Sequence, residues 1–110
     1  MPQTQVWGRL LGLAGQQLRT LDRGRPFQVL GADGNSLVIR VLSTGHERRI
    51  HRDEVEGAWR HLEDAGNLSR TDINVAYSPW NPAYVAALLA AVPGVEHTAR
   101  PITLWYRPRA

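Results

Sequence analysis

Cysteine is absent from this sequence of 110 residues. Disulfide bonds, thiolate metal sites and thiol catalysis are therefore excluded. Long apolar runs are also missing, since none approaches the roughly 20 residues that a membrane-spanning helix needs. The first five residues lack the basic and apolar regions of a secretory signal peptide. We therefore expect a cytoplasmic protein with no membrane partner.

Lysine is absent as well, so all 13 basic residues are arginine. A GC-rich genome explains this bias most simply, because it favours arginine codons. Arginine is nevertheless always charged and can fork onto a carboxylate or a phosphate. The formal charge is +3 over residues 1–30, −2 over residues 31–75 and +2 over residues 76–110. The two ends, rather than the middle, are thus expected to face any polyanion.

The overall composition is that of an ordinary folded protein, with 43% hydrophobic and 21% charged residues. A chain of this length suits one domain with a single hydrophobic core. We predict a single α+β domain. Residues 1–52 would supply a helix and a small β-meander, and residues 53–110 would supply a helical half that ends in a hairpin.

In the first half, apolar residues recur at helical spacing from Val6 to Leu21 and predict a helix over residues 5–21. Gly8, Gly12 and Gly15 weaken that helix. Three strands should then form an antiparallel meander, with Asp-Gly at the first turn. Their expected ranges are 27–30, 36–42 and 47–51.

Capping residues divide the helical half. Asp53 is the expected N-cap of the first helix, with Glu56 completing a capping box. Gly66 should end that helix. Ser69, with Asp72 three positions later, should cap a short second helix.

The third helix is expected to run from Asn81, with Pro82 at its first position, to Val92. Residues 95–97 and 102–107 then read as the two strands of a hairpin. The alternative is that the last strand joins the meander in one larger sheet. The α+β class would survive that change.

The order helix, short helix, helix and hairpin over residues 53–106 resembles a bacterial winged helix-turn-helix. The segments GNLSRTDI and NPAYVAALLAAVPGVE carry this resemblance. It implies that the third helix faces duplex DNA with Asn81 and Ala83 at the groove, and that Arg100 sits at the tip of the wing. It also implies that arginines contact phosphates. The DNA-binding residues it predicts are Arg70, Trp80, Asn81, Arg100, Arg107 and Arg109.

The third helix departs from that pattern. It has no arginine or glutamine and only one asparagine, whereas direct base readout uses such side chains. Its four alanines are more typical of a packing helix. We therefore expect contact mainly with the DNA backbone. The alternative is a protein-interaction or oligomerisation module, a homodimer included, whose binding residues would be Tyr77, Trp80, Tyr84 and Trp105.

Trp80 lies in the unusual segment Tyr77–Pro82 and has two interpretations. Its indole could be a platform for a base, a peptide or a protein partner. It could instead pack back on Val85 as a hydrophobic staple. Trp7 and Trp59 lie on apolar helix faces and are expected in the core.

Residues 46–54 hold two histidines, three arginines and three acids. We interpret this segment as a solvated strand with cross-strand ion pairs. A metal site, or a small hydrolase or nuclease centre using His46, His51 and an acid, is the alternative. The spacing of these histidines matches no zinc signature, and no nucleophile motif occurs. We therefore predict no enzyme, no metal and no cofactor, and expect the isolated His61 to be exposed.

Overall fold

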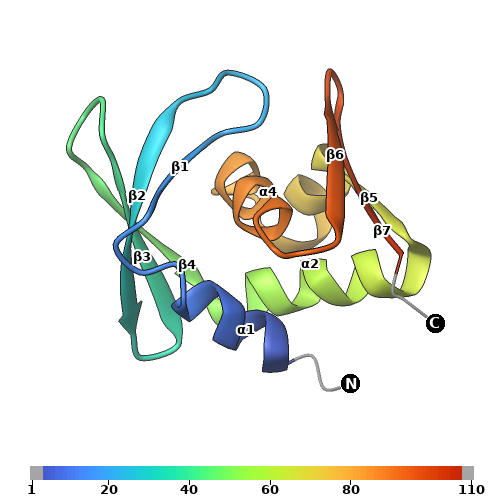
Figure 1. Ribbon diagram of the computed structural model, residues 1–110, viewed down its shortest axis with the longest axis horizontal. Helices are drawn as coiled ribbons and strands as arrows, with labels where there is room; N and C mark the ends of the chain where they lie inside the picture. The colour runs from blue at the N-terminus through green and yellow to red at the C-terminus, as the bar shows by residue number, and fades with distance from the viewer. Residues whose placement is uncertain (1–3, 108–110) are drawn as a thin grey trace.

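The computed structural model describes residues 4–107, which form an α+β fold. An N-terminal helix precedes a four-stranded antiparallel meander, and helices and a C-terminal hairpin sheet follow (Figure 1). The predicted α+β class is confirmed. No helix within residues 4–107 is long and apolar enough to cross a membrane.

The first helix, α1 (Thr4–Leu11), is shorter than expected. The prediction of a helix to residue 21 is wrong, because the chain leaves the helix after Leu11 and Gly15 adopts a φ of +88°. Residues Gln17–Arg19 instead form strand β1, in which Leu18 is paired with Phe27. Apolar spacing alone could not distinguish a helix from a strand over residues 17–19, since a short strand can also direct Leu18 toward the core.

Strand β1 adds an edge to the meander that the sequence did not predict. The other strands are β2 (Pro26–Asp33), β3 (Ser36–Val41) and β4 (Glu47–His51), and the order is β1-β2-β3-β4. The three predicted strands are therefore confirmed. Alternate residues point inward, as expected for a sheet with one covered face; they are Phe27, Val29, Leu37, Ile39 and Ile50.

Strand β4 runs directly into helix α2 (Arg52–Ala65). The N-cap is His51, whose Nδ1 accepts a hydrogen bond from the backbone N–H of Asp53 at 3.1 Å. Glu54 closes the box by accepting from the His51 N–H at 2.8 Å. The predicted box of Asp53 and Glu56 is thus wrong by two residues, because the helix starts where the strand ends. Gly66 ends the helix with a φ of +82°, as predicted.

After α2 the chain makes the short strand β5 (Asn67–Ser69), helix α3 (Arg70–Asp72) and the π-helical turn η1 (Ile73–Tyr77). The capping box of Ser69 and Asp72 is confirmed, since each side chain accepts the other's backbone N–H. Strand β5 was not predicted. It pairs with the last strand of the chain, so the partner that makes it a strand lies far away in the sequence.

Helix α4 (Pro82–Ala90) begins at the predicted proline. The hairpin of β6 (Val95–Ala99) and β7 (Ile102–Tyr106) follows, and β5 completes a second sheet in the order β5-β7-β6. The last strand therefore does not join the meander. Every residue of α4 from Val85 to Leu89 is buried, so this helix packs on several sides instead of presenting one open face.

Helix α4 lies between the two sheets, with α2 running beneath them (Figure 1). One hydrophobic cluster joins α1, α2, α4 and both sheets, and it includes Trp7 and Trp59, as expected. The loop between β1 and β2 and the turn between β6 and β7 both rise on the side away from α1 (Figure 1). Asp22 and Arg23 of the loop and Arg100 of the turn line one surface hollow.

Candidate functional site

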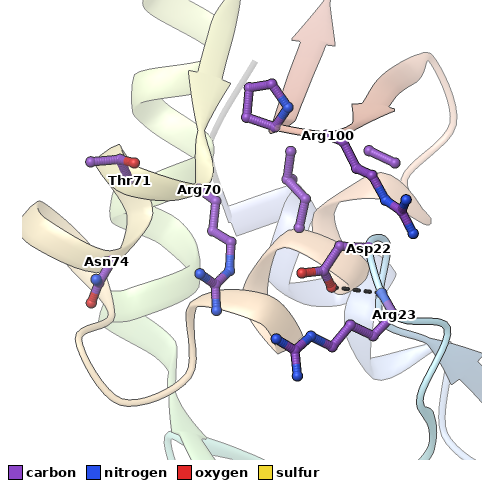
Figure 2. Close-up of a pocket in the computed structure, with 9 residues that line it drawn as sticks. Asp22, Arg23, Arg70, Thr71, Asn74 and Arg100 are labelled. Carbon is purple, nitrogen blue, oxygen red and sulfur yellow. Dashed lines mark hydrogen bonds between the residues drawn. The ribbon is translucent and has the colours of Figure 1, made fainter.

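Three arginines from separate parts of the chain line one surface hollow of about 480 Å³. Arg23 comes from the β1–β2 loop, Arg70 from the start of α3 and Arg100 from the β6–β7 turn. Figure 2 shows Arg70 and Arg23 reaching toward the same space, with Asp22 between them. Thr71 also contributes to the wall of the hollow.

A second hollow of about 320 Å³ shares Asp22, Arg23 and Arg70 with the first. It adds Arg25 and, from the N-terminal end of α4, Tyr84. The two hollows are therefore neighbouring parts of one basic surface. We call this surface the arginine site and define it by Arg23, Arg25, Arg70 and Arg100.

The loop of residues 20–25 is closed at its base. The buried Thr20 accepts the Arg25 N–H through Oγ1 at 2.9 Å, and its own N–H donates to the Arg25 carbonyl at 3.0 Å. Gly24 has a φ of +65°, a conformation that other residues rarely adopt. The turn therefore presents Asp22 and Arg23 at its tip on a constrained backbone.

Arg70 is the first residue of α3, and the Ser69–Asp72 capping box fixes its backbone. The Asp72 carboxylate accepts the Ser69 N–H at 3.3 Å. Arg100 lies in the turn that follows Ala99, where Thr98 donates through Oγ1 to the Pro101 carbonyl at 3.2 Å. Local hydrogen bonds thus position both backbones that carry these arginines.

The arginine site has an excess of positive charge. Its four guanidinium groups share a single lining carboxylate, Asp22, which already accepts the Arg23 backbone N–H at 2.8 Å. Within residues 4–107, none of the four makes an ion pair. Guanidinium groups without a protein counter-charge suit phosphate, which they can bind through two parallel hydrogen bonds.

The structure brings together only part of the predicted DNA-binding set. Arg70 and Arg100 both line the first hollow of the arginine site. Arg107 follows the other end of β7 and lines a different hollow with Glu96 and Trp105. Five strand residues separate it from the β6–β7 turn, or roughly 16 Å. Arg109 lies outside the described residues.

Asn81 needs correction as a groove-facing residue. It is only 6% exposed, and its amide accepts a hydrogen bond from Arg48 at 3.2 Å and donates to the Arg49 carbonyl at 3.5 Å. These internal contacts leave it little surface for DNA. Trp80 beside it is 84% exposed, so its indole does not pack back on the buried Val85.

The other predicted partner-binding aromatics have different surroundings. Tyr77 is half-buried and its hydroxyl lies 2.9 Å from Nδ1 of His61. Tyr84 is also half-buried and packs edge-to-face on Phe27. Trp105 is 45% exposed, in agreement with the expectation of a partly open face on the last strand.

The histidines do not assemble a metal centre within the described part of the chain, where no three histidine or acidic side chains cluster suitably. His51 caps α2, and His46 is exposed in the turn before β4. His61 is half-buried against Tyr77, so the expectation that it is exposed is corrected.

Sequence reasoning missed Arg23 and Arg25 as site residues. The available signal was the positive excess of residues 1–30, which did point to a polyanion. What could not be predicted was that the β1–β2 loop lies beside Arg70, which is distant in sequence.

The chain matches no model of a protein family, no curated protein and no solved structure. Its function must therefore follow from the chemistry of its own residues. The arginine site is the feature with the clearest chemical preference, because it gathers uncompensated positive charge in a hollow.

Proposed function

We propose that this protein is a small DNA-binding domain that contacts mainly the duplex backbone through the arginine site. The observation that carries the proposal is the convergence of Arg23, Arg70 and Arg100 from three separate elements, without an ion pair among the described residues. Phosphate contacts supply most of the sequence-independent affinity of such proteins. A concave surface with several guanidiniums offers such contacts.

The arrangement of the second half supports a winged-helix form of this proposal. Helices α2, α3 and α4 precede the β6–β7 hairpin, and β5 ties that hairpin back to the helices. Arg100 would then be at the tip of the wing, and Arg70 at the start of the short helix. Both would contact phosphates on the same side of the domain.

Backbone contact is favoured over base readout because of α4. Its residues from Val85 to Leu89 are buried, so their side chains are not available to base edges in a major groove. Asn81, the one residue of its start suited to adenine, is occupied internally. We therefore expect similar affinity for duplexes of different sequence.

Fluorescence anisotropy of a labelled random-sequence duplex tests the proposal, with salt raised from about 50 mM to 200 mM. Three or four phosphate contacts predict that log K falls against log salt with a slope of about −3. The arginine site has that many guanidiniums. Absence of binding at the lowest salt would refute the proposal, because electrostatic attraction is strongest there.

A second candidate is a self-association module built on the second sheet. Strand β6 is at the edge of that sheet, and Trp105 on the neighbouring strand is 45% exposed. An open edge can pair with a strand of another copy. Sedimentation equilibrium would then show a dimer that Trp105→Ser weakens, whereas a monomer at high concentration would exclude it.

A further inference from the structure

Trp80 is exposed although the residues around it are anchored. Its indole is 84% exposed, whereas Ser78 is fully buried and Asn81 is 6% exposed. Trp7 and Trp59 are each only 6% exposed and Trp105 is 45% exposed, so Trp80 is the most exposed tryptophan of the chain. A large apolar side chain left open beside buried neighbours indicates a contact surface for a ligand.

The backbone that carries Trp80 is held from both sides. Ser78 donates through Oγ to the Glu54 carboxylate at 2.5 Å. Arg48 donates to the Trp80 carbonyl at 3.4 Å and to Asn81 Oδ1 at 3.2 Å. Pro79 and Pro82 further restrict the segment. The indole is therefore presented on a constrained support, which lowers the entropy cost of binding a ligand.

Trp80 is connected to the arginine site through Arg48 and Tyr84. The guanidinium of Arg48, which holds the Trp80 carbonyl, lies over the Tyr84 ring at 5.4 Å from its centre. Tyr84 in turn lines the hollow that contains Arg23, Arg25 and Arg70. The segment that carries Trp80 and the tyrosine that lines the arginine site thus both lie at the N-terminal end of α4 and are joined by Arg48.

We infer that Trp80 stacks on an unpaired nucleobase while the flanking phosphates occupy the arginine site. The inference rests on the proposed DNA binding and names its preferred ligand, which is DNA with at least one unpaired base. Aromatic side chains beside a basic groove are how proteins bind unpaired nucleotides, because every base offers a π face. In an intact duplex the neighbouring base pairs cover those faces.

The surroundings of Trp80 favour a nucleotide over a protein partner. Anchor residues in protein interfaces are typically ringed by contacts that exclude water. The Trp80 carbonyl accepts a hydrogen bond from the exposed Arg48, whose guanidinium also lies over Tyr84 at the border of the arginine site. This charge suits a ligand that carries a phosphate on each side of its base.

The test measures, by fluorescence anisotropy, the binding of three labelled duplexes that differ only at one position. One is fully paired, one carries a single extra thymine, and one carries an abasic site in place of that thymine. We expect the extra thymine to raise affinity by about fivefold or more, since stacking on one base contributes at least that factor. The abasic duplex should bind like the paired one, because it reproduces the backbone distortion without the base.

Trp80→Ala should abolish the preference for the extra thymine, so that its affinities for the paired and the thymine-containing duplex become equal. Trp80→Phe should keep most of the preference, because a phenyl ring still stacks. Trp105→Ala is the matched control, since it removes a second exposed tryptophan, which lies on strand β7. That variant should retain the preference.

Tryptophan fluorescence gives an independent readout. Oligothymidylate should quench part of the wild-type emission and should cause no such quenching in Trp80→Phe, because the stacked indole is lost. Equal binding of paired and thymine-containing duplexes would overturn the inference and leave the proposed function intact, as would a preference that survives in Trp80→Ala. A change confined to self-association in Trp80→Ala would overturn it in favour of a protein partner. Failure to bind any DNA at low salt would overturn both.

Discussion

Arginine has different surroundings in two regions of this molecule. Three arginines on the meander and its junction with α2 are paired with nearby carboxylates; the pairs are Arg40–Glu47, Arg49–Asp33 and Arg52–Glu56. In the arginine site, Arg23, Arg25, Arg70 and Arg100 have no such partner among residues 4–107. The same side chain is therefore neutralised in one region and left available for a ligand in the other.

Whether an arginine is paired depends on how the chain places a carboxylate beside it. Strand register places Arg40 opposite Glu47, and helical spacing places Glu56 four residues after Arg52. No regular strand or helix spacing places a carboxylate beside the arginines of the arginine site, because these come from a loop, a helix start and a hairpin turn. The carboxylates nearest in sequence to Arg23, Arg25 and Arg70 are Asp22 and Asp72, which accept backbone N–H groups instead. The guanidinium groups that strand register and helical spacing leave without a carboxylate are the ones that can bind an anionic ligand.

The largest expected effect comes from reversing two charges of the arginine site. Arg70→Glu with Arg100→Glu should weaken duplex binding by about 100-fold or more, since each lost charged hydrogen bond contributes more than a factor of ten. Both side chains are exposed, so the melting temperature should change little. The matched control is Arg9→Glu with Arg40→Glu, which changes the net charge equally outside the site. Comparable loss in both variants would show that only overall charge matters.

A smaller loss of duplex affinity should follow when a carboxylate is introduced into the arginine site, so that its arginines resemble the paired arginines of the meander. Asn74 is exposed and lines the same hollow as Arg70 and Arg100. Asn74→Glu should reduce affinity by about fivefold, because one added negative charge repels phosphate and competes for the guanidiniums. Anisotropy measures the change, and Asn74→Gln is the neutral control. An unchanged affinity in the glutamate variant would argue that phosphate does not enter this hollow.

The opposite change should increase affinity slightly. Asp22→Asn removes the one carboxylate of the arginine site and keeps an oxygen that can accept the Arg23 N–H. We expect binding tighter by about threefold, with the gain reduced at high salt. Titrations at two salt concentrations check both parts. Weaker binding would mean that Asp22 orients the arginines more than it opposes the ligand.

The smallest effect is expected from the paired region. Arg40→Gln removes an ion pair whose side chains are 44% and 53% exposed. The free energy of unfolding should fall by no more than about 0.5 kcal/mol, which chemical denaturation measures, because exposed pairs contribute little. Duplex affinity should stay within about twofold. A marked loss of binding would break the distinction between the two regions.

Local signals predicted much of the fold. Gly66, the Ser69–Asp72 box and Pro82 each marked an element boundary, because capping depends on residues within one turn of the chain. Two predictions failed for lack of such signals. Residues 12–21 had helical apolar spacing but left the helix after Leu11, and β5 is too short to show a pattern of its own. The candidate site was predicted only in part, through Arg70 and Arg100.

The sequence by itself determined the α+β class, the meander, the hairpin and the abundance of arginine, because these depend on composition and on spacing between neighbours. The tertiary structure alone decided which arginines remain unpaired, that Arg23 and Arg25 join Arg70 and Arg100, and that Asn81 is buried while Trp80 is exposed. The physical reason is that each of these outcomes depends on contacts between segments distant in the chain. Local spacing carries no information about such contacts.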